Sequence, residues 1–302
     1  MEVIFGIDNI SPFKERSYVT IGNFDGYHKG HKLLVEKVQR KAIKGEGKSV
    51  LITFFPHPQS LFVSDFKIVN SLEVKIEKLR KTGVDYLIII PFTHQFSNIS
   101  AFEFVQDILI DKLNCKGVVI GYDFAFGKKG EGNGEFLKKY QQFSTEVVEA
   151  VTFNGLIASS TVLRKALLDG DIALYNNISG DYPLYTGVVV KGLGLGKKFG
   201  FATANFYLPS NLLFPKKGVY AVKVIVGTET FSGVANFGTK PTIGSNKLVV
   251  EVHIFGLEEN LYGKKITLKL IQFLREEKQF CSKQKLITQV NEDIIRSKEI
   301  LC

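Results

Sequence analysis

The sequence predicts an α/β protein in two parts: a doubly wound parallel sheet, then a small antiparallel β-barrel with a terminal helix. In the first half, apolar runs alternate with amphipathic segments, a pattern typical of a parallel sheet covered by helices. In the second half, short apolar runs are separated by glycine and polar turns, which indicates an antiparallel sheet or barrel. The 302 residues leave room for two domains of moderate size.

Composition narrows the class of protein. Hydrophobic residues make up 45% of the chain and charged residues 23%, and no apolar run approaches the roughly 18 residues of a membrane span. The start of the sequence shows no secretory leader, and the three cysteines are an odd number without metal-binding spacing. We therefore expect a cytoplasmic protein without a membrane partner. A monomer or a weak homo-oligomer is expected, although the composition does not determine the oligomeric state.

The charge balance is basic. A net charge of +9 suits polyphosphate ligands as well as nucleic acid. Because the lysines are scattered along several helical segments, we expect most of this charge to lie on solvated helix faces and expect no nucleic-acid partner.

The elements of the first half follow from their apolar patterns. Strands are expected at 18–21, 49–54, 86–90 and 117–120. An amphipathic pattern with apolar residues four apart predicts a helix after His31, and a second helix is expected at 72–81. Ser100 and Glu103 form a capping box at the start of a third helix.

The stretch 20–31 lies at the turn between the first strand and the first helix. It contains the run Gly22-Asn23-Phe24-Asp25-Gly26-Tyr27-His28-Lys29-Gly30-His31. Its glycines let the backbone approach a ligand, and a helix N-terminus favours a phosphate. His28 and His31, three apart, can donate hydrogen bonds to one phosphate. The alternative is a glycine-rich loop with two solvated histidines; a zinc pair is disfavoured because two further ligands are missing.

Three more stretches follow or precede expected elements. His57 lies in a loop, 53–58, that two prolines make rigid, and a structural turn is its simpler explanation. Asp123 follows the strand at 117–120, where it can accept a hydrogen bond from an adenosine hydroxyl or amino group. The hydroxyls of Ser159, Ser160 and Thr161 precede a helical run at 162–168 and, with Arg164, form a second phosphate cradle. An N-cap and a surface charge are the alternative there.

Together the stretches 22–31, 53–58, 121–127 and 159–164 resemble the motifs of bacterial FAD synthetases, members of the HxGH nucleotidyltransferase superfamily, over roughly 20–168. The resemblance implies adenylylation of FMN by ATP, with His28, His31 and Arg164 acting on the phosphates. It implies substrate binding by Gly22, Asn23, Asp25, Gly26, His57, Asp123, Ser159, Ser160 and Thr161. The chain departs from the family at Ala125 and Val162, where arginine is usual, which removes two positive charges near an anionic substrate.

A polar, turn-forming stretch at 176–183 is expected to separate two domains, 1–180 and 181–302. Beyond it, strands are expected at 186–190, 219–226, 231–236, 249–255 and 266–271, and a helix at 282–300.

The glycine-rich run 192–200, which contains Lys197, looks like a phosphate loop without Walker A spacing, and a flexible hairpin is its alternative. Thr203 and Asn205 follow, and their oxygens suit Mg²⁺ that carries a nucleotide. The runs 192–205, 233–242, 250–255 and 273–280 resemble the riboflavin kinase module from about 185 to the C-terminus. Ala202 replaces a usual proline, which loosens the loop.

Both halves together resemble bacterial bifunctional riboflavin kinase/FMN adenylyltransferase. The resemblance implies riboflavin, FMN, FAD and ATP with Mg²⁺ as ligands, Glu251 as general base of the kinase step, and Lys197, Thr203 and Asn205 on Mg²⁺–ATP. Two alternatives stay open: a chain that retains only one of the two activities, and a flavin- or nucleotide-binding regulator that contacts RNA.

Overall fold

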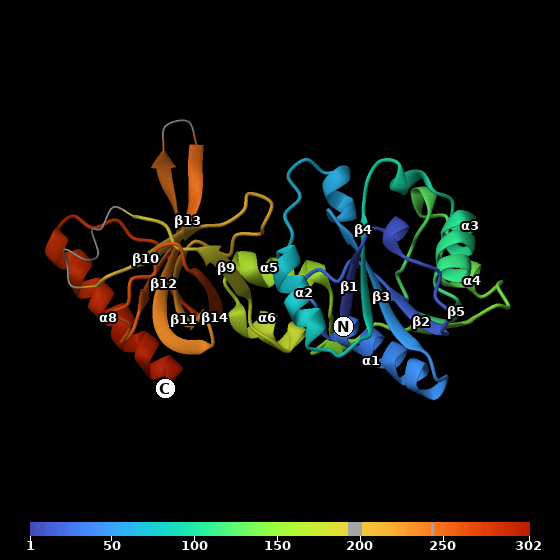
Figure 1. Cartoon of the computed structure of the whole chain (residues 1–302). Helices are drawn as coiled ribbons and strands as arrows, with labels where there is room; N and C mark the ends of the chain where they lie inside the picture. The colour runs from blue at the N-terminus through green and yellow to red at the C-terminus, as the bar shows by residue number, and fades with distance from the viewer. Residues whose placement is uncertain (193–200, 243–244) are drawn as a thin grey trace. The chain divides into compact units, whose positions relative to one another are not determined.

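The computed structural model describes residues 1–192, 201–242 and 245–302. Contacts divide the chain into two compact units, Met1–Ser160 and Thr161–Cys302 (Figure 1). No helix within these described ranges is both long and apolar enough to cross a membrane.

The first unit alternates strands and helices, as its sequence predicts. Its strands are β1 (Glu2–Phe5), β2 (Ser17–Ile21), β3 (Lys48–Phe55), β4 (Tyr86–Pro91), β5 (Cys115–Gly121), β6 (Ser144–Val148), β7 (Thr152–Phe153) and β8 (Leu156–Ile157). Its helices are α1 (Lys29–Lys44), α2 (Leu72–Arg80), α3 (Ala101–Glu103) and α4 (Gly134–Leu137), with short helical segments η1 (Ile7–Asn9), η2 (Pro58–Leu61), η3 (Phe96–Asn98), η4 (Phe104–Lys112) and η5 (Lys128–Gly130).

Six strands form a parallel sheet in the order β1-β4-β3-β2-β5-β6. The doubly wound prediction is therefore confirmed, and the four expected strands are β2, β3, β4 and β5. The edge strands β1 and β6 were not predicted, because an edge strand is partly exposed and its apolar signal is weak.

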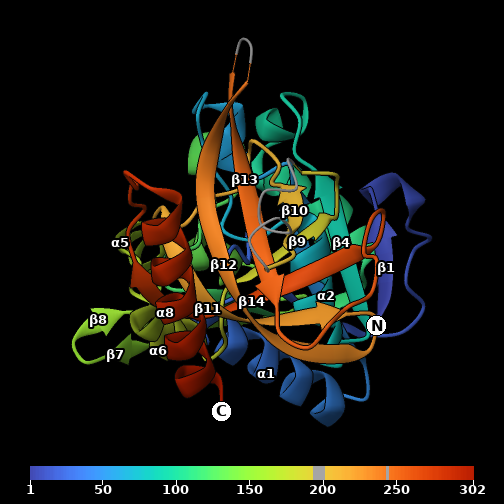
Figure 2. The ribbon, with the colours of Figure 1, turned by 90° about the vertical axis from the view of Figure 1, so that its left-hand side faces the viewer.

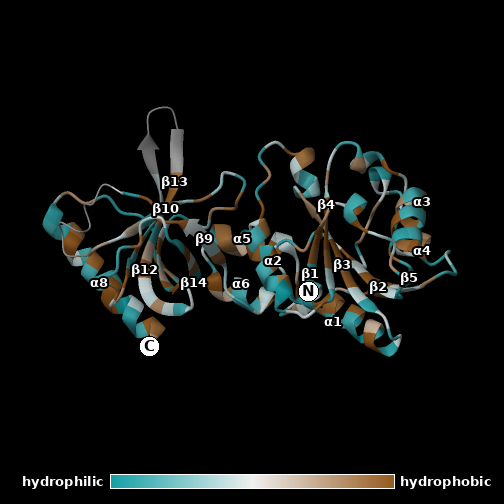
Figure 3. Cartoon of the chain, viewed as in Figure 1, coloured by the Kyte–Doolittle hydropathy of each residue, from teal (hydrophilic) through white to brown (hydrophobic). Residues whose placement is uncertain are grey.

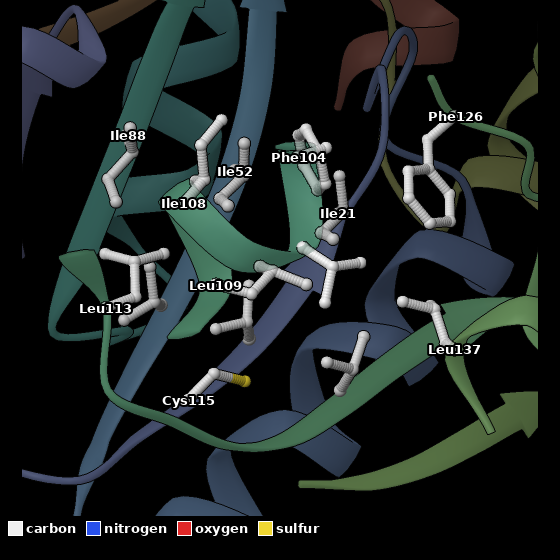
Figure 4. Close-up of a cluster of buried hydrophobic side chains, with 14 of the residues drawn as sticks. Ile21, Ile52, Ile88, Phe104, Ile108, Leu109, Leu113, Cys115, Phe126 and Leu137 are labelled. Atoms are coloured by element: carbon white, nitrogen blue, oxygen red, sulfur yellow. The ribbon is translucent and has the colours of Figure 1, made fainter. Parts of the chain in front are cut away.

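Helices cover both faces of this sheet. On one face, α1 and α2 pack through Val35 and Leu79 against Leu51 and Leu87 of the sheet. On the other face, Ile52 and its neighbours meet a cluster of side chains from η4 and α4 (Figure 4). The central strands are accordingly hydrophobic, while polar residues gather on the outer sides of the helices (Figure 3).

The expected capping box begins the third helix. The Ser100 side chain accepts from the Glu103 N–H, and the Glu103 carboxylate accepts from the Ser100 N–H at 2.7 Å. α3 then continues directly into η4, a π-helical segment whose end is marked by the Leu113 N–H donating to the Ile108 carbonyl at 3.0 Å. The wider turn places Phe104 and Leu109, both buried, toward the sheet.

The second unit is a barrel with helices at its start and end. Its elements are α5 (Ser160–Asp169, which begins at the last residue of the first unit), α6 (Ile172–Ser179), β9 (Leu184–Val188), β10 (Ala204–Tyr207), β11 (Gly218–Val226), β12 (Glu229–Thr242), β13 (Ser245–Ile254), β14 (Lys265–Arg275) and α8 (Lys283–Leu301). The strands pair antiparallel in the order β10-β13-β12-β11-β14-β9. The predicted barrel with a terminal helix is confirmed, although β10 was not expected as a strand.

The edges of this second sheet meet. The Val190 N–H, just after β9, donates to the Asn205 carbonyl on β10 at 2.7 Å and forms a bridge between the two ends of the sheet. Aromatic rings fill the interior, where Phe237 contacts Tyr185 and Tyr220 edge to face. α8 lies along the outer face of β11 and β12 (Figure 2).

The prediction of a turn over 176–183 is wrong for its first half. Asp171 caps a helix by accepting from the Leu174 N–H at 2.8 Å, and α6 runs to Ser179. The polar Asn176 interrupts the apolar pattern in the sequence, so the helix was not predicted. Tyr175 and Ile178, on its apolar face, are fully buried. The turn begins only at Gly180, whose left-handed backbone (φ 69°) ends the helix.

Candidate functional site

The loop after β2 is anchored by two buried rings. The Gly22 N–H donates to the Ile52 carbonyl at 3.1 Å. Phe24 (φ 47°) and Tyr27 (φ 48°) have left-handed backbones, which cost about 1–2 kcal/mol each. Both side chains are buried, and burial of one such ring contributes about 1.5–3 kcal/mol. The aromatic anchors therefore hold the loop in a conformation that only Gly26 (φ 81°) adopts without cost.

This conformation leaves backbone donors available. Within the described part of the chain, the N–H groups of Gly26 and Tyr27 have no hydrogen-bond acceptor. They directly precede the N-terminus of α1, whose first N–H groups lack helical acceptors. A run of such donors beside a helix N-terminus forms a binding site for an anion such as phosphate.

The two predicted histidines stack at the start of α1. Their ring centroids are 3.6 Å apart and their planes differ by 24°. Burial lowers the pKa of His28 to about 4. Burial, helped by the positive charges of His28 and Lys75, holds the pKa of His31 well below its ordinary value. Both rings are therefore neutral near pH 7, chiefly because burial disfavours their charged forms.

The hydrogen bonding of these rings determines the tautomer of His28. His28 Nδ1 caps α1 by accepting from the His31 N–H at 3.4 Å, so the neutral His28 ring carries its proton on Nε2. His31 Nδ1 is buried and has no partner among the described residues. The pair can donate uncharged N–H hydrogen bonds to phosphoryl oxygens.

Asp25 and Ser160 join two of the predicted motifs. The Asp25 carboxylate is 1% exposed and accepts from the Val69 N–H at 2.9 Å and the Asn70 N–H at 3.3 Å. The Ser160 hydroxyl donates to the Asp25 carbonyl at 2.7 Å. Asp25 therefore braces the loop against the segment before α2, and Ser160 connects it to the start of α5.

The other predicted residues of the first unit lie on separate loops. His57 is buried, caps η2 by accepting from the Gln59 N–H at 3.2 Å, and stacks on Phe66 at 4.5 Å. Asp123 is exposed in the turn after β5, and Ser159 is half-buried. Asn23 contributes its carbonyl, which accepts from Thr53 and from Lys75.

The remaining residues of the fourth motif belong to the second unit. Thr161 is exposed and Arg164 is half-buried, both on α5. Contacts within the second unit, including the Lys216 N–H that donates to the Leu167 carbonyl at 2.8 Å, fix this helix.

In the barrel, three polar residues lie in one row across neighbouring strands. Asn205 on β10 pairs with Glu251 on β13, and Glu251 pairs in turn with Asn236 on β12. Paired residues of antiparallel strands point to the same face. The Asn236 amide donates to the Glu277 carboxylate at 3.3 Å. The structure thus brings the predicted base beside one predicted metal ligand, and adds Asn236 and Glu277 to the site.

The donors near Asn205 suit a magnesium ion. Asn205 is 6% exposed, and its amide donates to the Thr203 carbonyl at 3.4 Å. A Cβ added at Gly192 would lie 2.6 Å from Asn205 Nδ2, so only glycine leaves room for this side chain. The Thr203 hydroxyl and the Asn205 amide oxygen are hard oxygen donors, the kind that Mg²⁺ prefers. Lys197 lies outside the described residues.

Sequence reasoning missed Lys75, which is 5% exposed on α2. The available signal was its position: Val74, Lys75, Lys78 and Leu79 share the buried side of the helix. A lysine on the apolar side of an amphipathic pattern is unusual unless it has a polar partner.

Two family models match the chain. A family model described as FAD synthetase matches residues 10–162, and one described as riboflavin kinase matches residues 180–301. A protein of Buchnera aphidicola subsp. Schizaphis graminum named bifunctional riboflavin kinase/FMN adenylyltransferase is 37% identical over 97% of each chain. An Escherichia coli K12 protein of the same name is 35% identical over 99% of this chain and 97% of its own.

A solved structure has the same fold along the whole chain. It is titled as a macrolide-efflux protein from Streptococcus pneumoniae, is 28% identical, covers 99% of each chain and superposes with a TM-score of 0.91. Because two family models and near-full-length relatives agree, the chain belongs to the bifunctional riboflavin kinase/FMN adenylyltransferase family.

Proposed function

We propose that this chain phosphorylates riboflavin to FMN and then adenylylates FMN to FAD, using ATP in both steps. The observation that carries the proposal is that each half has its own set of polar residues: the stacked histidines in the first and the Asn205–Glu251 pair in the second. We assign adenylylation to residues 1–180 and phosphorylation to 181–302. The stretch 161–180 stays with the first function because Arg164 belongs to its fourth motif.

In the kinase step, the 5′-hydroxyl of riboflavin attacks the γ-phosphorus of ATP, and ADP leaves. The hydroxyl loses its proton to the Glu251 carboxylate, which serves as general base. Asn236, opposite Glu251, orients the hydroxyl or the base. Thr203 and Asn205 would hold Mg²⁺, which would supply positive charge to the phosphates of ATP, and Lys197 is assigned to the same nucleotide.

In the adenylyl step, the FMN phosphate is already an anion and needs no base to attack the α-phosphorus of ATP. Pyrophosphate leaves. His28, His31 and the loop amides donate hydrogen bonds to the phosphates, and Arg164 supplies positive charge. Gly22, Gly26 and Asn23 shape the loop for this contact.

The remaining residues support binding in this step. Ser159, Ser160 and Thr161 form a hydroxyl-rich helix start near the phosphate chain, and His57 and Asp123 bind substrate groups. Asp25 acts by holding the loop, since its carboxylate is occupied by two backbone amides.

A time course tests this proposal. The purified chain is incubated with riboflavin, ATP and Mg²⁺, and the three flavins are separated by chromatography. We expect FMN to rise first and then give way to FAD. FMN that accumulates without FAD, also when FMN is supplied directly, would contradict the adenylyl half. Absence of any conversion, with flavin binding retained, would contradict both halves.

A further inference from the structure

Lys75 is a buried lysine that the mechanism above does not use. It lies on α2 and is 5% exposed. Its ammonium donates to the carbonyl of Asn23, in the loop after β2, at 2.7 Å. The same ammonium lies 3.5 Å from the Thr53 hydroxyl at the end of β3.

The Asn23 carbonyl therefore has two donors from two elements. The Thr53 hydroxyl donates to it at 3.1 Å, and Lys75 donates from α2. A single donor leaves a peptide group free to tilt, whereas two donors from elements on different sides fix its plane. We call Lys75, Thr53 and the Asn23 carbonyl the carbonyl clamp.

The clamp determines where the next amide points. In a trans peptide the C=O and N–H groups point in opposite directions. Because the Asn23 carbonyl faces Lys75 and Thr53, the Phe24 N–H faces away from both. Phe24 is 0% exposed, so the clamp fixes the buried start of the loop that continues through Gly26 and Tyr27 to the N-terminus of α1.

We propose that Lys75 is a positioning residue for FMN adenylylation: through the carbonyl clamp, it holds the loop after β2 in the conformation that leads the Gly26 and Tyr27 N–H groups to the phosphates of ATP. This inference rests on the function proposed for the loop. The role also accounts for a lysine at a position where burial of a charge is costly. A hydrophobic residue at position 75 would leave the Asn23 carbonyl with one donor, the Thr53 hydroxyl.

Charged groups around Lys75 fit this role. Burial lowers the pKa of Lys75 to about 8, and the Asp25 carboxylate opposes that shift. The positive charge of Lys75 in turn helps to lower the pKa of His31, on α1. Near pH 7 the ammonium is charged and can donate. Above about pH 8 it loses its proton, so the clamp loses part of its strength.

The test compares Lys75→Met with Lys81→Met, a control at the exposed end of the same helix. FAD formation from supplied FMN and FMN formation from riboflavin are measured separately for each. We expect Lys75→Met to lower kcat of FAD formation at least about tenfold, with a smaller change in KM and normal FMN formation. Lys81→Met keeps both rates.

The pH profile separates positioning from simple loss of folding. In the unmodified chain, kcat of FAD formation falls above about pH 8, and FMN formation does not share this fall. Lys75→Met removes the alkaline fall along with most of the rate. If Lys75→Met does not fold, Thr53→Val, which conserves volume, gives a smaller loss of FAD formation with the same selectivity.

Unchanged kcat in Lys75→Met, or a wild-type profile without the alkaline fall, would overturn the role of Lys75. His31→Ala is measured in parallel. If His31→Ala abolishes FAD formation while Lys75→Met does not, the proposed role of the carbonyl clamp is wrong but the assignment of the loop stands. If neither affects it, the assignment of the loop itself fails.

Discussion

Asn205 and Glu251 are direct partners in the antiparallel pairing of β10 with β13. Their side chains therefore lie on the same face of the barrel, although the proposed base and the proposed metal ligand are far apart in the sequence. The bridge from Val190 to Asn205 closes the barrel at this point. The pairing of β10 with β13 thus brings together two residues proposed for the kinase site.

The first prediction concerns this pair. Glu251→Gln keeps the shape of the side chain but removes the base, so FMN formation should fall about 10²–10⁴-fold. FAD formation from supplied FMN should stay normal, because it uses the other half. Chromatographic rates for the two reactions check this, and a Glu251→Gln chain with full kinase activity would exclude Glu251 as base.

A second prediction uses the space beside Asn205. Gly192→Ala places a Cβ 2.6 Å from Asn205 Nδ2 and 2.9 Å from its Cγ, so the amide must move. We expect KM for Mg²⁺–ATP in the kinase step to rise about tenfold or more, because an ion ligand is displaced. Titration of the kinase rate with Mg²⁺–ATP measures it. FAD formation from FMN in the same chain is the control, and an unchanged KM would argue against Asn205 as a ligand of the metal.

The histidine pair gives a third prediction. His31→Ala removes an uncharged donor beside the loop amides, and loss of one such donor costs about 10²–10³-fold in kcat. FAD formation should fall by this amount while riboflavin phosphorylation is unchanged. Pyrophosphate release from FMN and ATP provides the measurement. A normal rate would show that the first motif has another role.

A fourth prediction follows from the lowered pKa of His28, about 4 instead of 6.5. Between these pH values the unfolded chain binds a proton that the folded chain rejects, so stability present above pH 6.5 is lost as the pH falls toward 4. This lowering of the His28 pKa corresponds to about 3 kcal/mol of unfolding free energy. His28→Asn keeps an N-cap but removes this titration.

Urea unfolding of both chains at pH 6.5 and at pH 4 checks the effect. Between pH 6.5 and pH 4, the free energy of unfolding should fall by about 3 kcal/mol less in the His28→Asn chain than in the unmodified chain. Part of the pH dependence remains, because the pKa of His31 is also lowered. Equal losses in the two chains would mean that His28 is not kept neutral by the fold.

Much of the fold could be predicted because its signals are local. The buried strands β2 to β5 are continuous apolar runs, and the Ser100–Glu103 capping box depends on neighbours in sequence. The short strand β10 and the edge strand β6 lacked such a signal, because their pairing with distant strands makes them strands.

The sites were predictable only as motifs. Sequence identified His28 and His31 but not their stacking, and it named Asp25 without showing that backbone amides of Val69 and Asn70 occupy its carboxylate. Lys75 was missed because its partner is a backbone carbonyl of another element, a contact that side-chain patterns do not encode.

The most direct test of two independent sites in one chain is complementation between two variants. His31→Ala and Glu251→Gln are incubated with riboflavin, ATP and Mg²⁺, each alone and then mixed, and FAD is measured by chromatography. We predict that His31→Ala alone stops at FMN, that Glu251→Gln alone leaves riboflavin unchanged, and that the mixture forms FAD. A mixture that forms FMN but no FAD, or a single variant that forms FAD from riboflavin at the normal rate, would contradict the account.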